Sequence, residues 1–388
     1  MPKVKELAHA GVQTAEARNY IKGKDFGINF FTTSPKQITS GTEAGASSNL
    51  AAIHNSGIPY SVNKISTYLS IPSHIDFSDK SYRSVNFFNL NADQLAFLYH
   101  LLGRKYFSSS FNIAYWFWEL SETPERWRGI LRCLHEVWTA SEFSRQAIQK
   151  KTSAPVITIP PMIEFSLPQA NRLQFQIPED KFVFLFTFDF RSYFERKNPM
   201  GIIKAFCNAF QNSTQTHLVL HCHGSERFPH QKRELIQSTL RHHNIQVIDS
   251  VLTQVQSRSL IACCDSYVSL HRSEGFGITI AEAMLLKKPV IVTNYSGNTD
   301  FTTEENSFLV DHHLIPILKT VGPYIKGNVW AEPSIEHAAQ LMKVVFKEKS
   351  SAQAKAEKGS KTIEGLFSGE RITELVKNRF ALTGTGFN

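Results

Sequence analysis

The chain has 388 residues, 42% of them hydrophobic and 12% aromatic, which is ample for packed interiors and makes two domains the natural expectation. Its 42 lysines and arginines exceed its 34 acidic residues, which suits a phosphate-bearing ligand, an anionic membrane surface or an ordinary basic protein. The positive charge is scattered rather than gathered in one stripe, so a nucleic-acid partner is not expected.

The cysteines and the N-terminal segment bear on the compartment. The five cysteines are odd in number, lie in apolar contexts and form no CxxC pair, which is typical of reduced, buried thiols: Cys133, Cys207, Cys222, Cys263 and Cys264. Residues 1–20 lack the apolar core of a secretory signal, and nowhere do eighteen apolar residues follow one another. We therefore expect a cytoplasmic protein without a membrane-spanning helix, for which peripheral membrane contact stays open.

The first half of the chain alternates between predicted strands and helices. Gly27–Phe31 is a predicted strand, and a loop separates it from a helix through Asn49–His54, which is the repeating unit of a parallel sheet. The other elements predicted in this half are a helix from Asp93 to Leu102 and strands at Ser84–Leu90, Asn112–Trp118, Val137–Ala140 and Val156–Ile159. Pro160 and Pro161 then open a segment typical of a linker.

A second series begins at Phe182–Phe188, whose almost uniformly apolar sequence predicts a strand buried on both faces of a sheet. Further strands are predicted at His217–Cys222, Gln246–Ile248, Ser266–Leu270, Pro289–Val292 and Ser307–Val310, and helices at Pro199–Phe210, Gln231–His242, Gln254–Cys263, Ser334–Lys347 and Ile372–Phe380. This order predicts an α/β protein with two doubly wound domains that face a central cleft. The predicted domains are residues 1–163 and 181–388, joined by a linker over 164–180, and the last helix is a candidate to pack back on the first domain.

Residues 269–301 (SLHRSEGFGITIAEAMLLKKPVIVTNYSGNTDF) form the most informative segment. Glu274 and Glu282 bracket a Gly-Phe-Gly turn that follows an apolar strand and opens a helix. Free N–H groups at a helix start attract an anion, and glycine allows a ligand to approach the backbone closely. The carboxylates would repel that anion, but they can accept hydrogen bonds from sugar hydroxyls. A ligand that carries both phosphate and several hydroxyls is a nucleotide-sugar.

The pair Glu274 and Glu282, with seven residues between them, resembles the motif of retaining glycosyltransferases of the GT-B fold, specifically family GT4, glycosyl transferases group 1. Residues 91–127, 137–148 and 188–206 resemble one GT4 subgroup, mostly bacterial and associated with surface polysaccharide synthesis. The resemblance runs from about Gly27 to the C-terminal helices. It implies two Rossmann-like domains and the transfer, with retention, of a hexosyl unit from a nucleoside diphosphate sugar to a glycan or lipid-linked acceptor.

The resemblance also implies partners and location. The subgroup suggests mannose from GDP-mannose as the donor, and neither a cofactor nor a metal is expected. The enzyme is expected in the cytoplasm, with peripheral contact at the inner membrane face left open. Two alternatives remain: another enzyme on the same scaffold, such as a nucleotide-sugar epimerase or a phosphorylase, and a non-catalytic partner subunit that binds sugar or a true transferase.

The resemblance assigns roles around the Gly-Phe-Gly turn. Glu274 contacts hydroxyls of the donor sugar, and Glu282 holds the ribose hydroxyls. Gly275, Phe276 and Gly277 present their N–H groups to the diphosphate. The plainer alternatives are that Glu274 caps the helix start and that Glu282 is a solvent-facing helix acid.

Arg196 and Lys197 follow the first strand of the second domain, where the family uses an Arg and a Lys to neutralise the departing diphosphate. Many members separate these bases by four residues, which would place Ser192 at the arginine position, so Arg191 or Arg196 takes that role here. A solvated loop base is the alternative for either. Loss of Lys197 or of Glu274 is expected to abolish most transfer and to leave thermal unfolding nearly unchanged.

Three further site residues follow from the resemblance. Val251 lies in a loop over the nucleotide base, where the family uses backbone groups. Gly41 begins the segment 41–45, which is either a loop that faces the donor phosphates and the acceptor or a plain flexible loop. Glu119 ends a strand at a position where many relatives place a histidine, so a polar role is open to it, whereas the neighbouring tryptophans are expected to pack.

Two other clusters have simpler interpretations. Residues 91–94 fit helix capping before any contact with the acceptor. His221 and His223 lie on one face of a predicted strand, but two imidazoles without a third ligand make a poor zinc site. We therefore expect these histidines to pack at the strand end.

Overall fold

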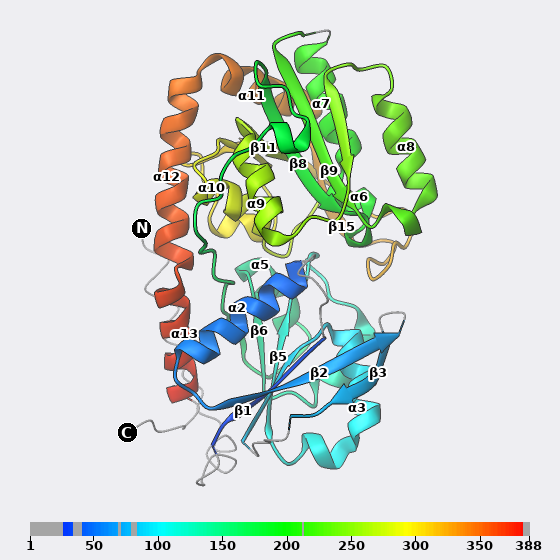
Figure 1. Ribbon diagram of the computed structural model, residues 1–388. Coiled ribbons are helices and arrows are strands. Elements are labelled where there is room, and N and C mark those ends of the chain that lie inside the picture. The colour runs from blue at the N-terminus through cyan, green and yellow to red at the C-terminus, as the bar shows by residue number, and fades with distance from the viewer. Residues whose placement is uncertain (1–25, 34–40, 69–70, 79–83, 212, 383–388) are drawn as a thin grey trace.

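The computed structural model describes residues 26–33, 41–68, 71–78, 84–211 and 213–382. The prediction on residues 1–20 lies outside these residues, as does most of the predicted loop before Gly41. Figure 1 shows two α/β domains stacked one above the other, the N-terminal one in blue and cyan and the C-terminal one in green and yellow. The last helices run along one side of both domains.

The N-terminal domain is built on a seven-stranded sheet in the order β3-β2-β1-β4-β5-β6-β7. Its strands are β1 (Ile28–Thr33), β2 (Tyr60–Tyr68), β3 (Ile71–Asp76), β4 (Val85–Asn89), β5 (Phe111–Trp116), β6 (Glu136–Thr139) and β7 (Val156–Thr158). Neighbouring strands are parallel except for β2 with β3. The named helices of this domain are α2 (Gly41–Asn55), α3 (Ala92–Phe107), α4 (Arg128–Leu131) and α5 (Glu142–Gln149).

A row of buried amides crosses the middle of this sheet. Asn29 Nδ2 donates to Asn86 Oδ1 at 3.1 Å, and Asn86 Nδ2 donates to Asn112 Oδ1 at 3.0 Å. The three residues face one another in the pairing of β1, β4 and β5. Because a slip of one residue would leave these amides buried without partners, the row specifies the strand register.

The sequence did not predict β2, because its buried positions carry polar side chains. Ser61 and Asn63 are 6% and 4% exposed. Ser61 Oγ donates to Asn29 Oδ1 at 3.2 Å, and Asn63 Oδ1 accepts from the backbone N–H of Ser78 at 3.0 Å. Hydrogen bonding therefore replaces apolar burial along this strand, and the alternating apolar pattern of a half-buried strand is missing.

The predicted loop at Gly41 is wrong, because Gly41 is the first residue of α2. Glycines at two positions of the first turns made a helix unlikely on propensity alone. The close packing of the helix accounts for one of them: a Cβ on Gly45 would lie 2.6 Å from the ring of Phe117. Tertiary packing thus determines the helix where propensity would not.

The C-terminal domain contains a six-stranded parallel sheet in the order β10-β9-β8-β11-β12-β13. Its strands are β8 (Phe182–Asp189), β9 (Thr216–His223), β10 (Ile245–Asp249), β11 (Ser266–Ser269), β12 (Val290–Thr293) and β13 (Phe308–Val310). Its helices are α6 (Phe194–Lys197), α7 (Pro199–Phe210), α8 (Pro229–Thr239), α9 (Gln254–Cys263), α10 (Ile278–Leu285) and α11 (Ile335–Lys347). The predicted doubly wound order is therefore present in this half.

An antiparallel hairpin of β14 (His312–Pro316) and β15 (Val329–Pro333) follows the C-terminal sheet and was not predicted. Tyr324, between its strands, is 2% exposed. Its ring centroid lies 5.8 Å from that of Trp118 and 5.0 Å from that of Tyr193. Tyr324 therefore joins an apolar cluster that belongs mainly to the N-terminal domain.

Two long helices end the described chain. α12 (Lys349–Phe367) runs beside the C-terminal domain, and α13 (Gly369–Leu382) lies on the N-terminal domain (Figure 1). Arg379 of α13 donates to both carboxylate oxygens of Glu136, at 3.0 and 2.6 Å. α12 was not predicted, because most of its buried face consists of small residues: Ala352, Ala356, Gly359 and Ser360, with Ile363 and Phe367.

The chain passes between the domains at two places that touch each other. The backbone N–H of Ile163 donates to the carbonyl of Phe367 at 2.9 Å. The N–H of Gly369 donates to Glu164 Oε2 at 2.7 Å. β7 and β8 lie on either side of the first passage, which contains the predicted linker over 164–180; the domain boundaries themselves stay predictions.

Two predictions from the sequence concern the cysteines and the absence of a membrane-spanning helix. All five cysteines are unpaired. Cys222, Cys263 and Cys264 are buried as predicted, whereas Cys133 and Cys207 are partly exposed. None of the helices in the described part of the chain is both long enough and apolar enough to cross a membrane.

Candidate active site

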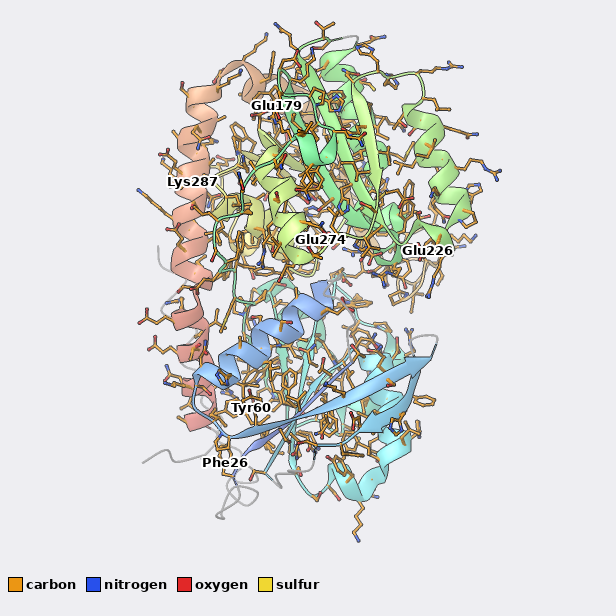
Figure 2. All side chains as sticks on the ribbon, in the orientation of Figure 1. Phe26, Tyr60, Glu179, Glu226, Glu274 and Lys287 are labelled. Carbon is orange, nitrogen blue, oxygen red and sulfur yellow. The ribbon has the colours of Figure 1, made fainter. Side chains whose placement is uncertain are left out.

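The candidate site is an open cleft lined by both domains, at the carboxyl ends of strands of the C-terminal sheet. Its lining includes these predicted site residues: Glu119, Arg196, Lys197, Glu274, Gly275, Phe276, Gly277 and Glu282. Glu274 lies where the two domains meet (Figure 2). Two predicted site residues are not among the residues that line the cleft. Val251 is 58% exposed, and its neighbour Leu252 lines the cleft instead. Gly41 starts α2, and Ala44 of that helix lines the cleft instead.

The start of α10 is open toward the cleft. Gly277 precedes it with φ of +95°, a backbone conformation that a residue with a Cβ rarely adopts. Among the described residues no side chain caps this helix start. Its first N–H groups are therefore available to an anion, and the helix dipole favours negative charge there.

The turn before α10 is held from both domains. Within the C-terminal domain, the N–H of Glu274 donates to Ser296 Oγ at 2.7 Å, and the N–H of Gly297 donates to the carbonyl of Glu274 at 2.9 Å. From the N-terminal domain, Ser141 Oγ donates to the carbonyl of Gly275 at 2.6 Å. These contacts engage the carbonyls of Glu274 and Gly275 and the N–H of Glu274, and they hold the turn in place at the edge of the cleft.

Glu274 lies between two cations. Lys197 Nζ is 2.5 Å from Glu274 Oε1, and Arg196 Nη1 is 3.2 Å from Oε2. The glutamate is 8% exposed and the arginine 3%. Burial alone would raise the pKa of Glu274, but the attraction of Lys197 and then of Arg196 outweighs it and lowers this pKa to about 2. The carboxylate is therefore ionised, and it is paired rather than acting as a helix cap.

The structure places Arg196, and not Arg191, in this centre. Arg196 Nη1 donates to the carbonyl of Ser273 at 2.7 Å, which ties the arginine to the turn before α10. Arg191 instead pairs with Asp189 at 2.9 Å. The short helix α6 thus brings two adjacent bases to one carboxylate, and its final residue Lys197 is followed by Asn198, whose Nδ2 donates to the carbonyl of Leu270 at 2.9 Å.

Glu282 is buried and lines the cleft, so it is not a solvent-facing acid. It is 6% exposed, and Oε1 accepts from Arg258 Nε at 2.9 Å. Burial raises the pKa of Glu282, while the charge of Arg258 opposes that rise. The guanidinium of Arg258 lies 4.1 Å from the ring centroid of Phe165. Sequence reasoning missed Arg258, because no spacing rule relates a residue of α9 to one of α10.

Glu119 is bound by the hairpin that the sequence did not predict. Its Oε2 accepts from the hydroxyl of Tyr324 at 3.1 Å, and its backbone carbonyl accepts from Ser273 Oγ. The ring of Tyr324 also lies 5.9 Å from the guanidinium of Arg196. Tyr324 therefore connects an acid of the N-terminal domain with the cationic centre of the C-terminal domain.

The variant Tyr324→Phe tests this connection. It keeps the ring but removes the hydroxyl, so the carboxylate of Glu119 loses a hydrogen bond. We expect the free energy of unfolding to fall by ~1.5–3 kcal/mol, as for a hydrogen bond to a charged group. Urea denaturation measures the change, and Tyr60→Phe is the matched control, because the Tyr60 hydroxyl bonds to the exposed His54. Equal losses in the two variants would contradict the connection.

His221 and His223 lie near the end of β9, as expected, and they also line the cleft. His221 Nε2 lies 3.0 Å from the carbonyl of Ser250, and His223 Nδ1 lies 3.5 Å from Asp189 Oδ1. The described residues include no group of three or more His, Cys, Asp or Glu side chains arranged to hold a metal ion. That the reaction needs no metal stays a prediction.

Two doubly wound domains that meet at a cleft, with an open helix start beside the buried Arg196 and the partly buried Lys197, define a GT-B glycosyltransferase. Residues 169–362, half of the chain, match the family described as glycosyl transferases group 1. The chain belongs to that family.

Solved structures agree with this fold. Sucrose-phosphate synthase from Thermosynechococcus elongatus superposes with a TM-score of 0.67 at 14% identity, over 92% of this chain and 99% of that one. HepE from Anabaena, solved with UDP and glucose, gives a TM-score of 0.63 at 15% identity, over 92% and 99%. A glycosyltransferase from Rickettsia africae gives 0.66 at 13% identity, over 94% and 99%. No match was found among curated proteins. The predicted fold class is confirmed.

Proposed function

We propose that this glycosyltransferase is a retaining GT4 enzyme, which moves a hexosyl unit from a nucleoside diphosphate sugar to a glycan or lipid-linked acceptor in polysaccharide synthesis. The observation that carries the proposal is the pairing of an open helix start with Arg196, Lys197 and Glu274. Helix N–H groups and cations suit a diphosphate, and a paired carboxylate suits hydroxyl donors.

Each group of this centre has a place in the transfer. The diphosphate lies against the start of α10 and the two bases, which stabilise the charge that builds up on it as it leaves. The acceptor hydroxyl attacks the anomeric carbon on the face from which the diphosphate departs. The bond to the acceptor oxygen forms as the bond to the phosphate oxygen breaks, and the acceptor proton passes to that phosphate oxygen. Glu274 positions the sugar through its hydroxyls, so catalysis consists of positioning and charge stabilisation.

The neighbours favour a UDP-sugar for the first test of the donor. HepE from Anabaena was solved with UDP-glucose, and a pneumococcal O-GlcNAc transferase, with a TM-score of 0.57 at 14% identity, was solved with UDP and GlcNAc. GDP-mannose, the donor suggested by the subgroup, is the second choice. Both present the same diphosphate to Arg196 and Lys197.

A surface of the N-terminal domain supports a lipid-linked acceptor at the membrane. Phe97 and Leu101 of α3 are 39% and 50% exposed, and Arg104 and Lys105, one turn later, are exposed as well. Apolar side chains beside basic ones suit an anionic bilayer surface. In this proposal the N-terminal domain rests on the leaflet that carries the acceptor.

The experiment that tests the function is a donor panel. UDP, GDP and ADP are each added to the protein, and the one that matches the donor should stabilise it by ~2.7 kcal/mol at 100 times its Kd. Release of the same nucleotide is then measured with UDP-glucose, UDP-GlcNAc and GDP-mannose, with and without a glycan acceptor. Stabilisation without release would indicate a binding subunit, and conversion of the sugar without an acceptor would indicate an epimerase. No stabilisation by any nucleotide would contradict the proposal.

A further inference from the structure

His221 occupies the floor of the cleft on the side away from Glu274. It lies on β9, opposite Thr187 of β8 and Ile248 of β10, and both His221 and Thr187 line the cleft. The sheet order β10-β9-β8-β11 puts β8 between His221 and the turn that carries Glu274. The histidine is therefore on the β10 side of the diphosphate centre, beside the loop that contains Leu252.

Hydrogen bonding fixes the form of this imidazole. Nε2 lies 3.0 Å from the carbonyl oxygen of Ser250, which can only accept, so Nε2 carries the proton. Burial lowers the pKa of His221 to about 4, so the ring is neutral at physiological pH. Nδ1 is then a bare acceptor at a side chain that is 4% exposed.

Nδ1 of His221 has no partner in the described structure. Several other buried side-chain atoms of the described residues also lack one, but His221 alone among their residues lines the cleft. The polar side chains nearby are engaged elsewhere: Thr187 Oγ1 bonds to the hydroxyl of Tyr267 at 3.2 Å, and His223 pairs with Asp189. A buried acceptor without a donor costs ~1–3 kcal/mol, so a donor from the ligand would recover that cost.

The chemistry of the missing partner limits what it can be. It must donate a hydrogen bond, and the oxygens of a diphosphate at neutral pH are acceptors. Leu252, Gln254 and Ser257 line the same side of the cleft, where the loop after β10 runs into α9. The nucleoside part of the donor carries both N–H and O–H groups, and it extends from the diphosphate.

We propose that His221 recognises the nucleoside of the donor sugar, by accepting at Nδ1 a hydrogen bond from an N–H of the base or an O–H of the ribose. This inference rests on the proposed function, because it needs a nucleoside diphosphate in the cleft. It adds a specificity-determining residue to that site.

Binding titrations on the purified full chain test the proposal. The ligands are the nucleoside diphosphate that stabilises the protein most, inorganic pyrophosphate, and three analogues: one methylated at the ring N–H of the base, one 2′-deoxy and one 3′-deoxy. The variants are His221→Leu, which removes the acceptor, and His221→Asn, whose side-chain oxygen can stand near the position of Nδ1. His217→Leu is the matched control, because His217 lies on the same face of β9, is 8% exposed and bonds to Gln246.

We expect His221→Leu to weaken nucleoside diphosphate binding at least about tenfold, or ~1.4 kcal/mol, and to leave pyrophosphate binding unchanged. His221→Asn and His217→Leu should stay within about threefold of the wild type. One analogue should bind the wild type as weakly as the parent ligand binds His221→Leu, which identifies the base or the ribose as the donor of the hydrogen bond.

Three outcomes would overturn the inference: an unchanged affinity in His221→Leu, an equal loss of pyrophosphate binding, or wild-type affinity for every analogue. The titrations with the analogues use only the wild-type protein, so they test the role of His221 even if His221→Leu folds poorly. If the wild type binds pyrophosphate but no nucleoside diphosphate, the proposed function falls, and this inference falls with it. If the wild type binds the nucleoside diphosphate normally, only the role of His221 is at stake.

Discussion

Glu274→Gln is expected to lower kcat for sugar transfer by about 10²–10³-fold, the usual effect of removing one preorganised electrostatic group. The amide keeps the shape of the side chain but loses the charge that orders Lys197 and Arg196, and it is a weaker acceptor for sugar hydroxyls. Steady-state kinetics with the donor identified by the panel measure the change.

The same variant should also be less stable, which corrects the expectation from sequence that loss of Glu274 leaves thermal unfolding nearly unchanged. Neutralising Glu274 leaves the buried Arg196 and the partly buried Lys197 without their counter-ion, and breaking a buried ion pair costs ~3–5 kcal/mol. Glu226→Gln is the matched control, because Glu226 is exposed on the outer side of the C-terminal domain (Figure 2). Wild-type kcat in Glu274→Gln, measured on folded protein, would remove Glu274 from the site.

The pH dependence of stability follows from the same ion pairs. The pKa of Glu274 is lowered from 4.5 to about 2, so the native state holds the ionised form more strongly than the unfolded chain does. The stabilisation is complete above pH ~4.5 and is lost as the pH falls toward 2. Loss of activity near neutral pH therefore has another cause than protonation of Glu274.

Lys197→Ala should lower kcat by about 10²–10³-fold as well, because the departing diphosphate loses one of the two cations that stabilise it. Binding of inorganic pyrophosphate should weaken in parallel. Stability should change less than in Glu274→Gln, since Glu274 keeps Arg196 at 3.2 Å as a partner. The control is Lys204→Ala, at an exposed lysine of α7. If Lys197→Ala retains wild-type kcat and pyrophosphate affinity, the diphosphate does not lie where we propose.

The sequence predicts helices and strands well where their buried side chains are apolar and their ends carry residues typical of a helix or strand boundary. Helix α7 begins at Pro199, and proline suits a first helical position because the N–H that it lacks would have no partner there. Asn198 caps the helix, since its Oδ1 accepts a hydrogen bond from the N–H of Gly201 at 3.1 Å. β8 is buried nearly throughout, and its apolar run shows it. β2 and α12 were not predicted for the opposite reason. Hydrogen-bonded polar residues occupy buried positions of β2, and small residues occupy most buried positions of α12.

The site divides in the same way. The family resemblance named Lys197 and Glu274 in advance and left Arg196 as one of two candidates with Arg191. Strand order agrees with these names, because each residue follows a strand of one parallel sheet and such ends converge. Tyr324 and Arg258 could not be named, because their contacts join segments that no local periodicity relates. Tyr324 depends on the hairpin crossing to the other domain, and Arg258 depends on how α9 packs against α10.

The two adjoining passages of the chain restrict how the domains can move. Since Ile163 bonds to Phe367 and Glu164 to Gly369, both connections lie along one line at the α12 and α13 side of the molecule. Such a pair permits rotation about that line but resists sliding and twisting. Admission of a substrate would then widen the opening most on the side away from these passages, and the hydrogen bonds that join the domains there, such as that between Tyr324 and Glu119, would have to break.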